Sequence, residues 1–142
     1  MLHRLTSEEK NSALRSVYEW ICGPLQQGVE GIIHIKGNKE CQLAVYPGTG
    51  SAHYERHRDA FPVDDHQDDE QRRLTTILYL NSDTWDVEDG GHLRIHDRPV
   101  VGNSSHLIAP ILGRCVTFLS GAIDHEVLPC HKDRVALTIW WQ

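Results

Sequence analysis

The segment Arg134–Trp141 reads RVALTIWW, and its pattern decides how the rest of the chain is interpreted. Branched and aromatic residues favour a β-strand, in which successive side chains point to opposite faces. One face is wholly apolar and carries Val135, Leu137, Ile139 and Trp141. The other face carries a cation, a small residue, a hydroxyl and an aromatic ring, namely Arg134, Ala136, Thr138 and Trp140. The first face predicts packing in a core, and the second predicts the wall of a polar cavity.

Strand-like patterns recur through most of the preceding sequence. Further strands are predicted at residues 31–36, 41–46, 53–59, 74–80, 92–96, 105–108, 116–119 and 125–128. The first two are predicted to form a hairpin through Gly37-Asn38, a dipeptide that is typical of tight turns. Glycine- and proline-rich turns, without helical crossovers, exclude a doubly wound sheet. The sequence therefore predicts a mainly β fold, a double-stranded β-helix or jelly roll with a cavity between antiparallel sheets.

The N-terminal region has a different, helical period. Residues 6–26 carry apolar side chains at 3.6-residue spacing, and Thr6 with Glu9 fits a capping box. Gly23-Pro24 is predicted to break or kink the last turns. We expect this helix to pack on one sheet, with the jelly-roll core at about 29–141. The 142 residues are expected to form a single domain.

Composition excludes several classes of function. The formal charge of −6 argues against nucleic acid as the principal partner, because binding a phosphate backbone needs a basic face. No run approaches the roughly 20 apolar residues of a membrane span, and the N-terminus has no secretion-signal core. The four cysteines lack C-x-x-C spacing and are expected to be reduced thiols. These features predict a cytoplasmic or nuclear protein.

His57-Arg58-Asp59 is the first part of a candidate metal site. Alternation along a strand lets His57 and Asp59 point the same way while Arg58 points outward. The His-x-Asp pattern is weak alone, since His66-Gln67-Asp68 repeats it. That second copy lies in the acidic run at 64–70 with no flanking strand, which indicates a solvated loop and not a rigid ligand set.

The remaining candidates lie near the C-terminus. His125 alone would more often be a structural histidine, but one turn separates it from Arg134, which predicts that the two lie on neighbouring antiparallel strands. Two imidazoles and one carboxylate suit Fe(II) and leave positions open for a co-substrate and O2. The Arg134 guanidinium matches a carboxylate through two hydrogen bonds, with Thr138 and Tyr79 as further donors. The alternative for Arg134 is a structural pair with an Asp or Glu.

Together these residues resemble the prolyl 4-hydroxylase family of Fe(II)/2-oxoglutarate-dependent dioxygenases. The sequence looks most like the cytosolic and nuclear branch that acts on hypoxia-inducible factor. Collagen-type enzymes are similar but place Lys where this chain has Arg134. The matching segments cover roughly 29–141 in family order, at residues 44–48, 54–59, 77–81, 90–95, 125–127 and 134–140.

The resemblance implies a role for each candidate residue. It implies iron ligation by His57, Asp59 and His125. It implies that 2-oxoglutarate is bound by Arg134 and Tyr79, with Tyr46 lining that pocket. It places three residues near the substrate: Arg56, Tyr54 and Trp140. Strand alternation, in contrast, puts Arg56 and Tyr54 opposite His57.

The implied activity is hydroxylation at C4 of a prolyl residue in an intracellular protein, with O2 as co-substrate, succinate and CO2 as products, and L-ascorbate as an iron reductant. Family members carry more chain before the helix and after residue 142, and the acidic segment at 63–72 has no clear counterpart. Three alternatives stay open: an oxygenase acting on another side chain or a small molecule, a zinc hydrolase using the same ligands, and a silent jelly-roll binding module.

Overall fold

The computed structural model describes residues 13–61, 70–97 and 104–142. Residue contacts divide the chain into two compact units, residues 1–36 and residues 37–142. Each unit is described by itself. The prediction that the whole chain forms one domain, with the helix packed on a sheet, stays a prediction.

The first unit contains consecutive helical segments. They are α1 (Ala13–Trp20), the π-helical turn η2 (Ile21–Leu25) and α2 (Gln26–Glu30). Pro24 lies inside the π turn, whose wider hydrogen-bonding pattern accommodates a residue without an N–H. The helical region therefore continues beyond the predicted end at 26. The predicted strand at 31–36 is wrong, because turn and irregular backbone follow α2 there. The predicted capping box at Thr6 and Glu9 lies outside the described residues.

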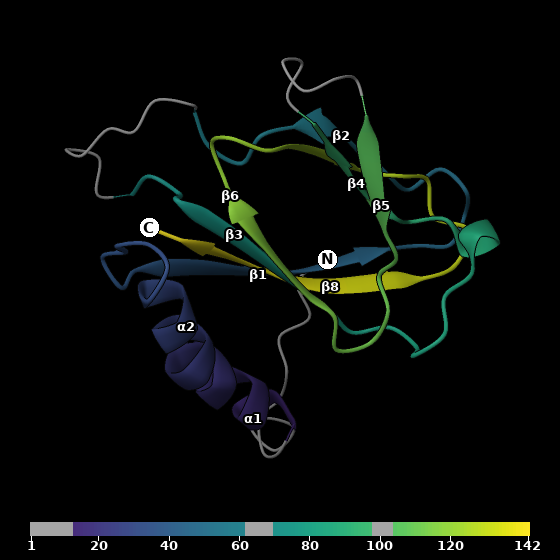
Figure 1. The fold of residues 1–142 in the computed structure, drawn as a ribbon. Coiled ribbons are helices and arrows are strands. Elements are labelled where there is room, and N and C mark those ends of the chain that lie inside the picture. Colours follow the sequence, from purple (N-terminus) through teal and green to yellow (C-terminus); the bar gives the residue numbers. More distant parts are fainter. Residues whose placement is uncertain (1–12, 62–69, 98–103) are drawn as a thin grey trace. The chain divides into compact units, whose positions relative to one another are not determined.

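The second unit consists of two four-stranded antiparallel sheets (Figure 1). The first has the order β1-β8-β3-β6, with strands Lys39–Tyr46, Arg134–Trp141, Leu74–Tyr79 and Cys115–Leu119. The second has the order β2-β7-β4-β5, with strands Tyr54–His57, Asp124–Val127, Leu93–His96 and Ser105–Ile108. A short 3-10 helix, η3 (Val87–Asp89), precedes β4. The mainly β jelly-roll prediction is confirmed.

Strand pairing differs from the predicted hairpin at the start of the sheet. β1 pairs along its whole length with β8, from Lys39 opposite Trp141 to Tyr46 opposite Arg134. The first strand of the sheet is thus paired with the last strand of the chain. This pairing joins residues that are far apart in the sequence. The local turn pattern at Gly37-Asn38 therefore could not predict it.

The connection between β7 and β8 has a second consequence for the site. β7 pairs with β2 and β4, whereas β8 pairs with β1 and β3. The prediction that His125 and Arg134 lie on neighbouring strands is therefore wrong. The segment between these strands crosses from one sheet to the other, so His125 and Arg134 belong to opposite walls of the molecule's interior.

The hydrophobic core of this unit is shared by both sheets. Its buried members are Ile77, Tyr79, Leu93, Phe118 and Ala136. Partly buried isoleucines and a valine pack against this cluster. The core thereby holds β3, β4, β6 and β8 at fixed separation and gives the site a rigid floor.

Two further predictions concern the chain as a whole. Among the described helices, none combines the length and apolar character that crossing a bilayer requires. None of the four cysteines, all of them in the described residues, forms a disulfide, and their being reduced thiols stays a prediction.

Phe118 provides a test of this core. Its side chain is 8% exposed, and its ring centroid lies 4.7 Å from that of His125. We expect Phe118→Ala to lower the free energy of unfolding by about 3–5 kcal/mol, measured by urea denaturation, because it leaves a cavity. The control is Leu107→Ala on β5, where the side chain is 53% exposed and the expected loss is below about 1 kcal/mol. Equal losses would contradict this description of the core.

Candidate metal centre

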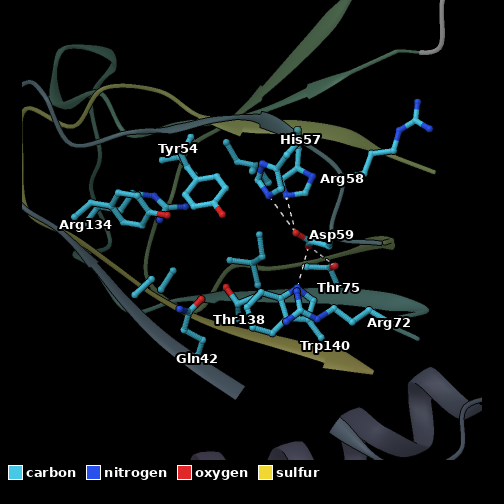
Figure 2. A pocket seen from close by; sticks show the side chains of 17 residues that line it. Gln42, Tyr54, His57, Arg58, Asp59, Arg72, Thr75, Arg134, Thr138 and Trp140 are labelled. Atoms are coloured by element: carbon cyan, nitrogen blue, oxygen red, sulfur yellow. Dashed lines mark hydrogen bonds and ion pairs between the residues drawn. The ribbon is translucent and has the colours of Figure 1, made fainter. Parts of the chain in front are cut away.

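A cavity of about 370 Å³ lies between the two sheets of the second unit. Its walls include the four residues of the mixed β8 face, Arg134, Ala136, Thr138 and Trp140, which confirms the predicted alternation. The other lining residues come from β1, β2, β3, β4 and β7 and from the segments beside them. Figure 2 shows Tyr54, His57, Asp59 and Thr138 around a shared space, whereas the Arg58 side chain points away from it.

His57, Asp59 and His125 converge at this cavity, and each offers one ligand atom within 4.8 Å of the others. Asp59 Oδ1 lies 3.1 Å from His57 Nε2 and 3.6 Å from His125 Nε2. Ligand atoms about 2.1 Å from an octahedral ion, at right angles to each other, are separated by about 3 Å. The three residues therefore have the chemistry and spacing to hold a divalent ion.

The backbone explains why these residues meet. His57 and His125 are directly opposite each other in the β2–β7 ladder. Asp59 lies just beyond the end of β2, where its N–H donates to the Ser120 carbonyl oxygen over 3.1 Å. The two histidines are thus cross-strand neighbours, and the turn at Ser120 fixes the carboxylate.

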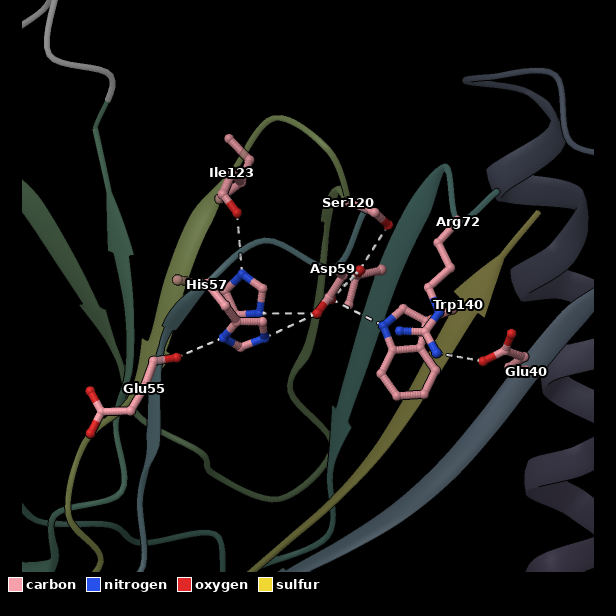
Figure 3. Close-up of polar contacts among 10 residues, drawn as sticks. Glu40, Glu55, His57, Asp59, Arg72, Ser120, Ile123 and Trp140 are labelled. Carbon is pink, nitrogen blue, oxygen red and sulfur yellow. Dashed lines mark hydrogen bonds and ion pairs between the residues drawn. The ribbon is translucent and has the colours of Figure 1, made fainter. Parts of the chain in front are cut away.

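Both imidazoles are oriented through their other ring nitrogen. His57 Nδ1 lies 2.7 Å from the Glu55 carbonyl oxygen, and His125 Nδ1 lies 3.2 Å from that of Ile123 (Figure 3). A carbonyl only accepts, so each Nδ1 carries a proton. In a neutral ring Nε2 then has the lone pair, and this is the tautomer that binds a metal; His57 donates to Asp59 only when its Nε2 is protonated as well.

Asp59 is a buried but charged carboxylate, with a side chain 7% exposed. Burial alone would raise its pKa, but hydrogen bonds from His57, Thr75 and Trp140, with the nearby His125, lower the pKa to about 2. The negative charge therefore persists at neutral pH inside the fold.

The two histidines respond to this charge differently. The hydrogen bond to Asp59 raises the pKa of His57, whereas burial lowers the pKa of His125 despite the same carboxylate. The environment thus favours the protonated, positively charged form of the His57 imidazole and the neutral form of the His125 imidazole. A divalent ion would supply the positive charge that this arrangement favours.

Arg134 lies in the same cavity and is 2% exposed. Its Nε donates to the Gly91 carbonyl oxygen over 2.9 Å. In the described part of the chain no carboxylate forms an ion pair with it, so the structural-pair alternative finds no support there. A buried guanidinium without a counter-ion costs several kcal/mol, which an anionic ligand would offset.

Tyrosines surround this guanidinium. Arg134 Cζ lies 5.0 Å from the Tyr46 ring centroid and 5.2 Å from that of Tyr79. The buried Tyr79 hydroxyl donates to no acceptor among the described residues; its neighbour Arg134 can only donate to it. Burial raises the pKa of both tyrosines, partly offset by Arg134. Both hydroxyls therefore stay protonated at neutral pH, and that of Tyr79 is a donor without an acceptor.

The structure also corrects one predicted orientation. The β2–β7 register shifts between Tyr54 and His57, so Tyr54 lines the cavity with its ring centroid 4.4 Å from that of His57. Simple alternation had placed Tyr54 on the opposite face. Arg58 borders the cavity, but its side chain is 40% exposed and pairs with Asp124, in agreement with the prediction that it points outward.

Arg56 does not line the cavity. It pairs with Asp124 over 2.6 Å, and the same carboxylate accepts from Arg58. These contacts tie β2 to β7 beside His125. The predicted role of Arg56 near the substrate therefore has no direct support from the cavity.

Three residues of the site were not singled out from the sequence: Gln42, Arg72 and Thr75 line the cavity. Thr75 shares a strand face with Ile77 and Tyr79, so alternation on β3 was a usable signal. No local sequence pattern marks Gln42 or Arg72 as site residues. Gln42 reaches the cavity because β1 pairs with β8, and Arg72 because it lies just before β3.

Fold and site together define a jelly-roll protein in which two histidines and one carboxylate, able to hold a metal, share one cavity with a buried arginine. The sequence pattern of the 2OG-Fe(II) oxygenase superfamily matches residues 41–142. The chain belongs to this superfamily.

Named relatives agree with this assignment. The chain is 36% identical over 133 residues to the hypoxia-inducible factor prolyl hydroxylase of Caenorhabditis elegans, a match that covers 92% of this chain and 17% of the relative. It is 34% identical over 116 residues to Egl nine homolog 1 of Homo sapiens, covering 80% of this chain and 25% of the relative. The chain thus spans less than a third of the length of these relatives.

Solved structures show the same fold. A Pseudomonas putida prolyl-4-hydroxylase is 32% identical with a TM-score of 0.73, over 93% of this chain and 67% of that one. A Trichoplax adhaerens prolyl hydroxylase, solved with a peptide fragment of hypoxia inducible factor, is 28% identical with a TM-score of 0.70, over 90% of this chain and 55% of that one. The resemblance to prolyl hydroxylases drawn from the sequence is confirmed.

Gly91 provides a test of how Arg134 is held. Its φ is 63°, and an added Cβ would lie 2.9 Å from Cys130 Sγ and 3.0 Å from Arg134 Cδ. We expect Gly91→Ala to lower the free energy of unfolding by more than the ~1–2 kcal/mol of left-handed strain alone. The matched control is Gly113→Ala, where φ is 74° and the added Cβ meets nothing within 4 Å. Equal losses in chemical denaturation would show that the close packing of Cys130 and Arg134 against Gly91 does not require a glycine there.

Proposed function

We propose that this chain is an Fe(II)- and 2-oxoglutarate-dependent dioxygenase that hydroxylates C4 of a prolyl residue in an intracellular protein. One observation carries the proposal: a buried arginine without a carboxylate partner among the described residues lies in the same cavity as the His57, Asp59 and His125 ligand set. A metal alone would not require this second charge. A dicarboxylic co-substrate bound to that metal would.

His57, Asp59 and His125 are the proposed iron ligands. Two neutral imidazoles and one carboxylate leave a net positive charge on Fe(II), so the site still attracts an anionic co-substrate. Three ligands on one side leave positions for a two-point chelate and for O2. Carbonyl hydrogen bonds at both Nδ1 atoms hold the imidazoles in the required orientation.

Arg134 is the proposed anchor for the distal carboxylate of 2-oxoglutarate. Its Nε is occupied by Gly91, so its terminal nitrogens are the groups available to form a charge-assisted pair. Tyr79 is the proposed second donor, because its buried hydroxyl has no acceptor among the described residues. Thr138 and Tyr46 line the cavity and complete the proposed binding surface.

Bound Fe(II) supplies the oxidative chemistry: O2 converts 2-oxoglutarate to succinate and CO2, and the second oxygen atom enters the substrate as a hydroxyl group. The chain orients the co-substrate between two fixed charges and limits water around it. L-ascorbate is the proposed reductant for iron oxidised in turnovers without substrate.

The substrate is proposed to be a proline-containing protein or peptide that approaches near Tyr54 and Trp140. Tyr54 lines the cavity beside His57, whereas the Trp140 N–H is already bonded to Asp59. Arg56 is placed near the substrate by resemblance alone. Cysteines that form no disulfide and prolyl hydroxylase relatives support a location in the cytoplasm or the nucleus.

The alternatives make different demands on the site. A zinc hydrolase would use the three ligands but has no need of Arg134. A silent binding module would not need three ligand atoms so close together. An oxygenase with another target would keep every residue role except those of Tyr54, Trp140 and Arg56. Such an oxygenase would differ from a prolyl hydroxylase only in the substrate that it accepts.

Succinate formation tests the enzyme class. Purified protein with Fe(II), 2-oxoglutarate and O2 should release succinate, and candidate proline peptides should increase the rate. His125→Ala should reduce succinate formation at least about 100-fold, because it removes a ligand. The control is His106→Ala, a β5 histidine with a side chain 68% exposed that should retain activity. Tight zinc retention without succinate formation would favour the hydrolase.

Arg134→Ala separates co-substrate binding from metal binding. We expect 2-oxoglutarate affinity to fall by at least ~2 kcal/mol, roughly 30-fold, since a buried charge pair is lost. Metal affinity should change by less than about threefold, measured by calorimetry under anaerobic conditions. Arg94→Ala, which breaks a pair with Glu126 outside the cavity lining, serves as the control. Equal loss of both affinities would remove the role assigned to Arg134.

A further inference from the structure

We propose that Thr75 and Trp140 are positioning residues that hold one oxygen of Asp59, so that this carboxylate offers the metal only its other oxygen. Arg72 acts through Trp140 by holding the indole in place. The proposal deepens the proposed function, on which it rests for the presence of a metal. It assigns roles to Thr75 and Arg72 and gives Trp140 a role other than substrate contact.

The two oxygens of Asp59 have separate environments (Figure 3). Oδ1 lies 3.1 Å and 3.6 Å from the Nε2 atoms of His57 and His125. Oδ2 accepts from Thr75 Oγ1 over 2.5 Å and from Trp140 Nε1 over 3.0 Å. The Thr75 and Trp140 donors thus both contact Oδ2, and the two imidazoles both lie beside Oδ1.

The Thr75 donor is itself fixed by a neighbour. Thr75 is fully buried, and its Oγ1 lies 2.9 Å from Ser120 Oγ. Because a hydroxyl has one proton, and Thr75 uses it on Asp59, the Ser120 hydroxyl is the donor in the second contact. The Ser120 backbone carbonyl also accepts the Asp59 N–H, so the same turn holds the Asp59 backbone directly and its carboxylate through Thr75.

The Trp140 donor is held from the opposite side. Arg72 Cζ lies 3.9 Å from the Trp140 ring centroid, a stacking contact of a cation on an aromatic face. Arg72 Nη2 donates to Glu40 over 2.6 Å, and Glu40 lies opposite Trp140 in the β1–β8 ladder. Strand pairing therefore fixes Glu40, Glu40 fixes Arg72, and Arg72 restricts the indole whose N–H reaches Asp59.

Single-oxygen ligation has a chemical consequence. Two imidazoles and one carboxylate oxygen occupy three of six octahedral positions, which leaves two for a chelating 2-oxoacid and one for O2. A carboxylate free to rotate could give the metal both oxygens and take a position from that chelate. Two hydrogen bonds on Oδ2 oppose this rotation.

The chain contains its own matched control. The next residues along the same strands form a second tryptophan–threonine pair, in which Trp141 Nε1 donates to Thr76 Oγ1 over 2.9 Å. Thr76 is also fully buried and contacts a second hydroxyl, that of Thr117, over 3.0 Å. This pair has the same chemistry but does not contact Asp59.

The experiment measures Mn(II) affinity of the apo-protein by anaerobic calorimetry, and then 2-oxoglutarate affinity at saturating Mn(II). The test variants are Thr75→Val, Thr75→Ser, Trp140→Phe and Arg72→Gln. The controls are Thr76→Val and Trp141→Phe. Urea denaturation of every apo-protein reports the stability cost separately.

We expect Thr75→Val and Trp140→Phe to weaken Mn(II) binding about 10- to 100-fold, the range typical for residues that orient a metal ligand. Both should also weaken 2-oxoglutarate binding at saturating Mn(II), since a freed Oδ2 competes with the chelate. Thr75→Ser should remain within about threefold of wild type, and Arg72→Gln should fall between. The control variants should lose stability and keep both affinities.

Equal effects of Thr75→Val and Thr76→Val on Mn(II) affinity would overturn the proposal, as would no effect of either. Should Thr75→Val fail to fold, Trp140→Phe against Trp141→Phe gives the same comparison. Wild-type protein that binds Mn(II) but makes no succinate from Fe(II) and 2-oxoglutarate would refute the proposed function alone.

Discussion

The buried carboxylate of Asp59 is the constraint on which the site depends. Burial opposes its charge, and four neighbouring side chains keep it ionised with a pKa of about 2. Arg134 is a buried cation in the same cavity, yet in the described part of the chain the two charges do not pair with each other. The part of the chain that the structure describes offers Asp59 only two imidazoles and two neutral donors, and it offers Arg134 no carboxylate. A metal chelated by a dicarboxylic acid would balance both charges, so the geometry and the family membership favour the same proposed chemistry.

Sequence patterns predicted the parts of this structure that strand alternation determines. The mixed face of Arg134–Trp141 lines the cavity because side chains alternate along any extended strand, whatever its partners. The apolar run at 74–80 and the short strand at 105–108 were recognisable for the same reason. His57 and Asp59 were chosen over His66 and Asp68 on the presence of flanking strands, and His57, Asp59 and His125 do converge.

Features that depend on distant partners were not predictable in this way. Residues 31–36 contain three isoleucines, and branched residues favour a strand only when a partner strand is present. The register shift between Tyr54 and His57 reverses the side on which Tyr54 lies, and no local signal marks it. His125 and Arg134 are close in sequence but belong to different sheets, because each strand finds better partners elsewhere. Arg72 and Gln42 reach the cavity only through the pairing of the first strand with the last.

The separation of His125 and Arg134 onto opposite sheets has a consequence for selectivity. The gap between the ligand set and the guanidinium lies in the cavity between two packed sheets, and three members of the shared core, Ile77, Leu93 and Ala136, line it. A packed interior resists compression, so the distance across this gap is fixed and does not adjust to the ligand. Compared with the proposed five-carbon co-substrate, a keto diacid one methylene shorter would not reach both ends of the gap, and one a methylene longer would not fit between them.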